Sequence, residues 1–470
     1  MPTLAEQLGA FVAETPFEAL PPDVAKQSKL RVLDMIGVSL VAAPLDYATT
    51  VLEVARRWGG PAESTVIGHG VKLPAPAAAL VNGTLAHGLD FDDTYLPALL
   101  HVGSVTVPTA LALAEALGRD GRDLVAAIAL GEEVDVRLGL ATGRGPTGGP
   151  ALFEQGFQST VCCGAIAAAA IVARLHRLDT GRTMHAIAVA ASTAAGLIES
   201  ARSGGWIKRA QAGWAAHSGV VAGQLAAAGF TGPATALEGK YGFLHAYTGG
   251  RFDPTRAGQG LGDTWHSREI QSKPYPCNHM LQPLVDAARL LREQDGVTPE
   301  DVEWIEAGVA ARALTTTAEP IEAKLRPATP YAAAFSLPFV TAKALLGGSS
   351  LGLHLADFTD ETIRDERVLA LTAKVRPFAD AQVTKDFPDR LGAVVRVHTK
   401  FGRALERRVP STRGSRDFPL TPADLELKFR LNAAYLLPDS QIASVQSFCT
   451  TLDSQSDLTL LTRTLAPSRV

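Results

Sequence analysis

The chain has 470 residues, more than one ordinary hydrophobic core holds, so we expect two domains. Hydrophobic residues make up 46% and charged residues 20%, which is typical of a globular protein with a large interior. The net charge of -4 argues against nucleic acid or an anionic membrane surface as the main partner. The 4 cysteines do not form a disulfide framework, and no signal peptide or uninterrupted membrane-length apolar run is visible, so we expect a cytoplasmic location.

Helical periodicity dominates the chain up to about residue 265. Apolar residues recur at helical spacing, and Pro21-Pro22 breaks the first stripe. Alanine and glycine are frequent in these segments and let neighbouring helices approach closely. We expect helices over 3–43 (with that break), 49–58, 75–89, 105–117, 124–140, 165–175, 184–197 and 215–229.

The pattern changes after residue 265. Residues 302–309 and 392–399 alternate as strands do, and 400–403 would turn the second one into a hairpin. Helices are expected over 282–294 and 333–346, and again over 422–436 and 441–465. The predicted fold is therefore mainly α. A large all-α helical domain is formed by both chain ends, 1–265 and 413–470, and a smaller α+β lid domain, 266–412, is inserted between them.

The segment 82–94 concentrates ionisable side chains between apolar, Ala-rich stretches. These are His87, Asp90, Asp92 and Asp93, with Thr94 at the end and His101 seven residues further on. Charges at this density are costly to bury unless they are paired or used. If 87–94 is helical, His87, Asp90 and Thr94 share one face. A metal site and a solvated loop that caps a helix at Asp93 or Thr94 are the alternatives.

Two other segments carry candidate binding groups. Lys208 and Arg209 lie among glycines and tryptophans, which suits a carboxylate ligand or, equally, a solvated surface turn. The loop 272–279 is bracketed by prolines at the domain boundary. Its Lys273 and His279 are placed to face a cleft between domains, or the loop is a hinge with exposed polar residues.

Motifs are spread in order along nearly the whole chain: 86–94, His101 with Val107-Pro108, 131–137, 229–233, 273–277, 334–339 and 428–430. Together they resemble the MmgE/PrpD family, which includes 2-methylcitrate dehydratase, cis-aconitate decarboxylase and iminodisuccinate epimerase. The resemblance implies a discontinuous all-α domain, an inserted α+β domain and a homodimer. It also implies chemistry without metal or cofactor on small di- or tricarboxylates.

By motif position, the resemblance assigns catalytic roles to Asp90, Thr94, His101, Lys208 and Lys273. We add as substrate-binding candidates His87, Asp93, Gln158, Arg209, Tyr275, Asn278 and His279. Two positions depart from the family pattern: Gln158 replaces a histidine of many relatives, and Asn278 replaces a histidine of the decarboxylase. Glutamine and asparagine bind a carboxylate but do not carry a proton at neutral pH. This disfavours decarboxylation and weakens the case for dehydration.

The function expected from these features is a metal-free lyase acting on a small di- or tricarboxylate, of the 2-methylcitrate dehydratase type. One alternative is an epimerase that moves an α-proton on a dicarboxylate, for which His101 with Tyr95 or Tyr275 would supply the two proton carriers. A cis-aconitate-type decarboxylase and an inactive carboxylate-binding relative are the others. We expect no nucleic-acid or membrane partner.

Overall fold

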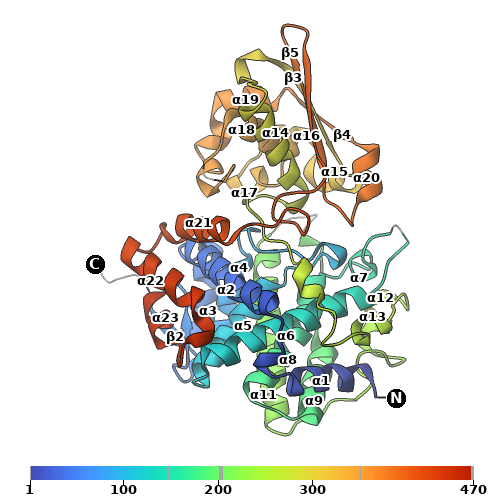
Figure 1. Ribbon diagram of the computed structural model, residues 1–470, viewed down its shortest axis with the longest axis vertical. Coiled ribbons are helices and arrows are strands. Elements are labelled where there is room, and N and C mark those ends of the chain that lie inside the picture. Colours follow the sequence, from blue (N-terminus) through green and yellow to red (C-terminus); the bar gives the residue numbers. More distant parts are fainter. Residues whose placement is uncertain (1, 147, 201–204, 350, 467–470) are drawn as a thin grey trace. The chain divides into compact units, whose positions relative to one another are not determined.

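The computed structural model describes residues 2–146, 148–200, 205–349 and 351–466. Helices predominate, which confirms the mainly α prediction (Figure 1). The chain divides into two compact units, Met1–Ile270 with Leu425–Val470, and Gln271–Asp424. Among the described residues no single helix has the length and apolar composition of a membrane span, and one pair bent by 95°, Pro22–Ala42 with Asp46–Arg57, passes that test only jointly.

The first unit is built from helices and one small hairpin. Its strands β1 (Ser64–Val66) and β2 (Val71–Leu73) pair antiparallel. Its helices are α1 (Leu4–Glu14), α2 (Pro22–Ala42), α3 (Asp46–Arg57), α4 (Ala75–His87), α5 (Gly103–Ala116), α6 (Gly121–Ala141), α7 (Ala151–Glu154), α8 (Ser159–Leu175), α9 (Thr180–Thr193), α11 (Ile207–Ala227), α12 (Phe243–Thr248), α13 (Thr255–Gly258), α22 (Asp439–Thr450) and α23 (Thr459–Thr464). Helix α21 (Pro422–Ala433) begins within the last residues of the second unit.

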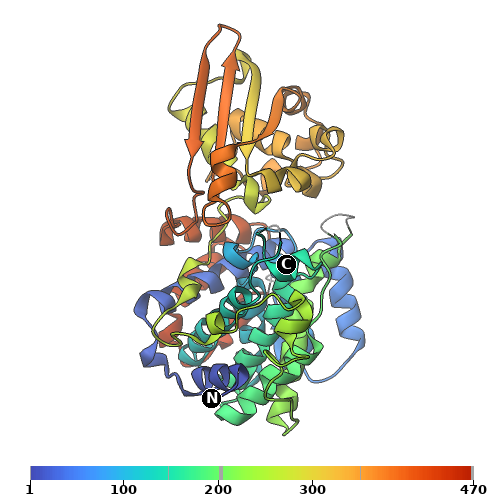
Figure 2. The same cartoon turned by 90° about the vertical axis from the view of Figure 1, so that its right-hand side faces the viewer.

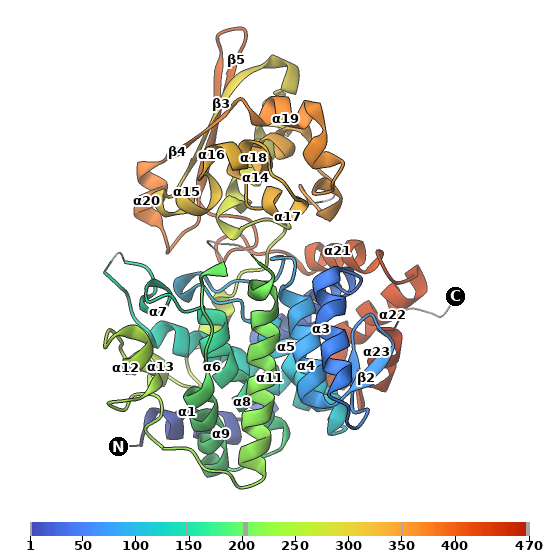
Figure 3. The ribbon, with the colours of Figure 1, turned by 180° about the vertical axis from the view of Figure 1, so that it is seen from behind.

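Close helix crossings in the first unit depend on glycine. Helix α11 packs against both α4 and α8 (Figure 3). A Cβ on Gly83 of α4 would lie 2.6 Å from the Cα of Gly213 on α11, so only glycine allows the two backbones to meet there. This crossing lies about one turn before the end of α4 and nearly two turns after the start of α11. It therefore brings the end of α4 close to the beginning of α11.

Both chain ends belong to the first unit. Helix α22 packs on α2, and a Cβ on Gly37 would lie 3.1 Å from the ring of Phe429 on α21. Helix α2 is buried along nearly its whole second half, from Arg31 to Ala42. The C-terminal helices α21 and α22 thus cover the helix that supports the site described below.

The second unit contains a four-stranded sheet in the order β4-β3-β5-β6 (Figure 2). Strands β3 (Val302–Val309) and β5 (Ala393–Thr399) confirm the two predicted strands, and β6 (Ala404–Val409) completes the predicted hairpin. Strand β4 (Val375–Ala379), which runs parallel to β3, was not predicted because its sequence does not alternate. The helices are α14 (Gln282–Glu293), α15 (Ala311–Thr317), α16 (Ile321–Leu325), α17 (Pro330–Ala333), α18 (Leu337–Leu346), α19 (Glu366–Thr372) and α20 (Ala381–Asp386).

Several predicted helices are shorter in the structure. The helix predicted over 333–346 begins only at Leu337, as α18, because the side chain of Ser336 caps its first turn; Ala333 is the last residue of the preceding helix α17. The segment 441–465 is split into α22 and α23. Helix α4 stops at His87 rather than at residue 89, and this early stop shapes the candidate site.

Candidate active site

The acidic segment begins where α4 ends, at His87. The next residue, Gly88, packs so closely on α3 that an added Cβ would lie 2.1 Å from the hydroxyl of Tyr47. Asp90 then adopts a left-handed backbone conformation, with φ of 54°, which aspartate tolerates better than most residues. Residues 87–94 are therefore not one helix, and the predicted shared face of His87, Asp90 and Thr94 is wrong.

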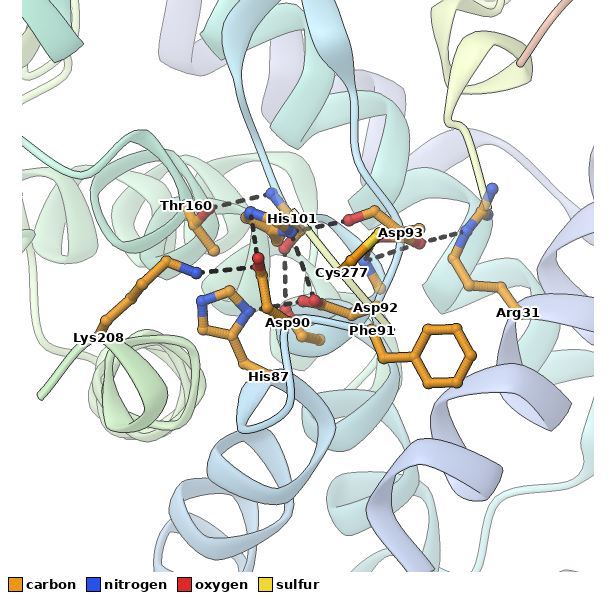
Figure 4. A network of polar contacts seen from close by, with 12 residues as sticks. Arg31, His87, Asp90, Phe91, Asp92, Asp93, His101, Thr160, Lys208 and Cys277 are labelled. Carbon is orange, nitrogen blue, oxygen red and sulfur yellow. Dashed lines mark hydrogen bonds and ion pairs between the residues drawn. The ribbon is translucent and has the colours of Figure 1, made fainter. Parts of the chain in front are cut away.

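Instead of sharing a helical face, the residues of this segment alternate between two environments (Figure 4). The carboxylates of Asp90 and Asp92 contact the histidines and Lys208. Asp93 pairs with Arg31, and the ring and main-chain oxygen of Phe91 contact Lys428. All four segment residues are buried. We call the side with Asp90, Asp92, the two histidines and Lys208 the front of the segment. The side with the ion pairs of Arg31 and Lys428 is its back.

The imidazole of His101 has a defined orientation. Its Nδ1 lies 2.9 Å from the main-chain oxygen of Asp93 and 3.4 Å from Oδ1 of Asp92. A carbonyl oxygen only accepts hydrogen bonds, so Nδ1 carries the hydrogen and Nε2 of the neutral ring carries the lone pair. The main-chain N–H of His101 donates to Oγ1 of Thr160, in the first turn of α8, at 3.0 Å. This hydrogen bond holds the backbone of His101 against α8. The side chain is 13% exposed.

Asp92 joins two histidines. Its Oδ2 accepts from Nδ1 of His87 at 2.7 Å, and the rings of His87 and His101 are 4.7 Å apart. Burial lowers the pKa of His87 to about 4, so this ring is neutral at pH 7. Burial opposes ionisation of Asp92, yet the two histidines and their hydrogen bonds hold the pKa of its carboxyl well below the usual value. Asp92 is therefore an anion placed against the Nδ1 side of His101.

Lys208, from the first turn of α11, completes the front. Its Nζ lies 3.0 Å from Oδ1 of Asp90, and the same oxygen is 3.9 Å from Nε2 of His101. The lysine side chain is 14% exposed and the Asp90 side chain 4%. One ammonium group and one imidazole lone pair thus lie on the two sides of a single carboxylate. A substrate acid placed here would meet a cation and a proton acceptor together.

The back of the segment is held by residues that sequence reasoning missed. Arg31 of α2 pairs with Asp93 at 2.8 Å and with Glu132 of α6 at 2.6 Å. Lys428 of α21 pairs with Asp34 at 2.8 Å and donates to the Phe91 main-chain oxygen at 2.8 Å. Glu132 and Lys428 fall in motifs that carry the family resemblance. Arg31 and Asp34 had only one signal, which is charge within an otherwise apolar helix.

Several predicted binding residues have other roles in the structure. Both carboxylate oxygens of Asp93 accept from the main-chain N–H of Gly103, at 2.9 and 3.1 Å, and one also meets Arg31, so this side chain caps α5 instead of binding substrate. Arg209 lies over the ring of Tyr47 at 4.6 Å. Gln158 is buried at the start of α8, two residues before Thr160. The buried Oγ1 of Thr94 has no hydrogen-bond partner among the described residues, which leaves it free for a ligand.

The remaining candidates belong to the second unit and are described within it. Lys273 is buried. The Tyr275 hydroxyl donates to Oδ1 of Asp286 at 2.6 Å, Asn278 caps a short 3-10 helix through Met280, and Nε2 of His279 lies 3.1 Å from Oε1 of Gln271. With these hydrogen bonds, Tyr275 and Asn278 stabilise the fold of the second unit.

The two tyrosines suggested as proton carriers do not suit that role. Burial raises the pKa of both tyrosines, Tyr95 and Tyr275, well above the usual value. A group that holds its proton this strongly is a poor base near neutral pH. Neither tyrosine therefore supplies the second carrier that an epimerase would need.

One group of metal-ligand type exists in the described part of the chain. Ligand atoms of His87, Asp92 and His101 lie within 4.8 Å of one another. Two of these atoms, His87 Nδ1 and Asp92 Oδ2, are 2.7 Å apart. Two ligands of a tetrahedral zinc ion are about 3.3 Å apart, since each lies about 2 Å from the metal. The pair therefore has the spacing of a hydrogen bond, and a metal would have to separate it.

Comparison with known proteins identifies the family of the chain. The MmgE/PrpD N-terminal domain matches residues 6–255, and the MmgE/PrpD C-terminal domain matches residues 275–452. The chain is 27% identical to cis-aconitate decarboxylase of Aspergillus terreus, over 94% of this chain and 91% of that protein. It is 26% identical to cis-aconitate decarboxylase of Mus musculus, over 98% and 93%. Because both family domains match in order over most of its length, the chain belongs to the MmgE/PrpD family of enzymes.

Proposed function

We propose that the protein is a lyase that removes water from a small hydroxylated di- or tricarboxylate, in the manner of 2-methylcitrate dehydratase. The observation that carries the proposal is the Nε2 lone pair of His101, 3.9 Å from the Asp90 carboxylate that Lys208 holds. A base beside a bound cation suits removal of a proton from the carbon next to a carboxylate.

The proposed reaction uses one proton carrier. Nε2 of His101 takes the α-proton, and the charge left on the substrate carboxylate is stabilised by Lys208. The C–O bond at the neighbouring carbon then breaks, and the departing hydroxide takes the proton back from Nε2 and leaves as water. Asp92, 3.4 Å from Nδ1, stabilises the imidazolium that exists between these steps. The cycle balances without a second titrating group.

The environment of His87 favours a substrate that carries a hydroxyl group. Its Nδ1 hydrogen is directed to Asp92, so Nε2 carries a lone pair. That nitrogen is buried and has no hydrogen-bond partner among the residues that the structure describes. A buried acceptor without a partner costs about 1–3 kcal/mol, and a substrate hydroxyl would remove this cost. The Thr94 hydroxyl offers a second such contact.

Decarboxylation is the second candidate, because the two relatives described above are named cis-aconitate decarboxylase. Loss of carbon dioxide leaves a carbanion that one protonated imidazole can quench, so His101 alone would also serve this reaction. The asparagine at position 278 argues against it, since an amide donates no proton at neutral pH.

One experiment separates these reactions. The purified protein is given 2-methylcitrate, cis-aconitate and iminodisuccinate separately, and proton NMR in deuterated water follows each. We expect the methyl doublet of 2-methylcitrate to be replaced by the methyl singlet of an unsaturated acid, because the proton on the methyl-bearing carbon is lost with the hydroxyl group. Release of carbon dioxide from cis-aconitate would show that the protein is a decarboxylase and not a dehydratase. Exchange of a substrate proton for deuterium without net conversion would favour an epimerase. Carboxylate binding without turnover or exchange would indicate an inactive relative.

The His101→Gln variant tests the residue on which the proposal rests. It should lose turnover, whereas His245→Gln, which changes an exposed histidine, should keep it. Turnover should also persist after treatment with a chelator. The homodimer remains a prediction from the family resemblance, and light scattering on the purified protein measures it directly.

A further inference from the structure

Helix α2 anchors the acidic segment at two points. Arg31 and Asp34 are three residues apart, so they lie on the same face of the helix. Arg31 reaches Asp93 directly, and Asp34 reaches the Phe91 main-chain oxygen through Lys428. The two anchors thus hold Phe91 and Asp93 of the segment. The alternate residues, Asp90 and Asp92, turn toward the histidines (Figure 4).

The Arg31 anchor leads directly to His101. Nε of Arg31 lies 2.8 Å from Oδ2 of Asp93, and its Nη1 lies 2.6 Å from Oε2 of Glu132, which in turn accepts from the Ser28 hydroxyl. The same Asp93 offers its main-chain oxygen to Nδ1 of His101. That oxygen is the nearer of two acceptors at Nδ1, at 2.9 Å against 3.4 Å for Oδ1 of Asp92, so it makes the better hydrogen bond and favours the tautomer with the hydrogen on Nδ1.

We propose that Arg31 is a positioning residue, which holds Asp93 so that its main-chain oxygen keeps the hydrogen of His101 on Nδ1 and leaves Nε2 as the proton acceptor. The inference rests on the proposed function for its catalytic meaning, but the tautomer itself is a property of the free protein. Arg31 touches neither the reacting atoms nor His101, and its whole effect passes through Asp93.

The second anchor supplies a matched control. Lys428 and Asp34 form an ion pair as buried as that of Arg31 and Asp93, and they hold the same segment. Lys428 donates to the main-chain oxygen of Phe91, whereas Arg31 pairs with the carboxylate of Asp93. Loss of this pair should therefore destabilise the protein to a similar degree without changing the acceptor that faces Nδ1 of His101.

The test is nitrogen-15 NMR of histidine-labelled protein, with the His101 signals assigned from their absence in His101→Gln. The wild type should show His101 with the hydrogen on Nδ1. In Arg31→Gln the Nε2-protonated form should appear, and kcat/KM should fall about tenfold to a hundredfold, because the buried ion pair that holds Asp93 is lost. Arg31→Lys keeps the positive charge but loses the planar guanidinium that contacts both Asp93 and Glu132. This variant should fold even where Arg31→Gln does not. A smaller fraction of its His101 should be protonated on Nε2.

Lys428→Met should lower the melting temperature and leave the His101 tautomer as in the wild type. The proposal is overturned if Arg31→Lys keeps the wild-type tautomer, or if Lys428→Met shifts it as much as the arginine variants do. A shifted tautomer with unchanged turnover would leave the positioning role intact and would instead remove His101 as the base. The inference and the proposed function thus fail by different results.

Discussion

Lys208 Nζ lies 3.0 Å from Asp90 Oδ1, although the two residues are 118 positions apart in the chain. The contact exists because α11 crosses α4 at Gly83 and Gly213, where no Cβ separates the backbones. The Asp90 side chain is 4% exposed, so its charge depends on this partner. The lysine is thereby held beside His101, where it adds positive charge to a group of two carboxylates, Asp90 and Asp92, and two histidines.

Replacement of Lys208 should remove both substrate attraction and the counter-ion of Asp90. We expect Lys208→Met to lower the transition-state stabilisation by about 2–5 kcal/mol, measured as the ratio of kcat/KM values. Lys72→Met is the matched control, because Lys72 of β2 also pairs with a carboxylate, Glu115, at 2.8 Å, but its side chain is 47% exposed. If both variants lose activity equally, Lys208 has no special role.

The buried His87 predicts loss of stability in mild acid. Its folded pKa is about 4 against 6.5 for the free side chain, so the unfolded chain binds one more proton between these values. Stability should therefore be full above pH 6.5 and should fall by about 3 kcal/mol as the pH drops to 4. Urea unfolding at pH 7 and pH 4.5 measures this. His87→Asn should show a smaller difference between the two pH values than the wild type, and an equal difference would contradict the assignment.

The buried Asp135 predicts the opposite pH dependence, a loss of stability as the pH rises. It is fully buried on α6, and neither carboxyl oxygen has a hydrogen-bond partner in the described part of the chain. Burial, and then the charges of Asp93 and Glu132, raise its pKa well above the usual value. The folded protein keeps this proton when the unfolded chain loses it above pH 3.8, so the group costs stability as the pH rises.

Asp135→Asn should therefore unfold at higher urea concentration than the wild type at pH 7. The gain should be about 1.4 kcal/mol for each unit by which the folded pKa is raised. The gain should shrink toward zero below pH 4. A variant that is less stable than the wild type at pH 7 would mean that the Asp135 carboxyl makes a favourable contact that the amide loses.

Two helix glycines should respond in opposite directions to alanine. A Cβ on Gly103 would lie 2.5 Å from Oδ2 of Asp93 and 2.9 Å from Cδ of Arg31, so it would force the buried ion pair apart. We expect Gly103→Ala to cost about 1–3 kcal/mol. In Gly181→Ala the nearest atom, Oδ1 of Asp179, is 3.4 Å away, and the helix propensity of alanine should stabilise the protein by up to about 1 kcal/mol. Thermal unfolding of the two variants compares them directly.

Local sequence determined most of the secondary structure. Helices such as α1, α2, α8 and α14 follow apolar stripes, and β3 and β5 follow alternation, because burial of one face requires those periods. Strand β4 and the short helices of the second unit carry no such period, since they are held by neighbours from elsewhere in the chain. The acidic segment, His101 and Lys208 could be singled out because charge among apolar residues is visible in a sequence.

The roles within that segment were decided only by the tertiary structure. Asp92 and Asp93 are adjacent and chemically identical, yet one faces two histidines and the other pairs with Arg31, which comes from a helix some sixty residues earlier. Sequence alone gives no means to tell them apart, because the path of the backbone after α4 fixes which side chain turns forward. That path depends on Arg31, Lys428 and Tyr47, each brought to the segment from a distant part of the chain by helix packing.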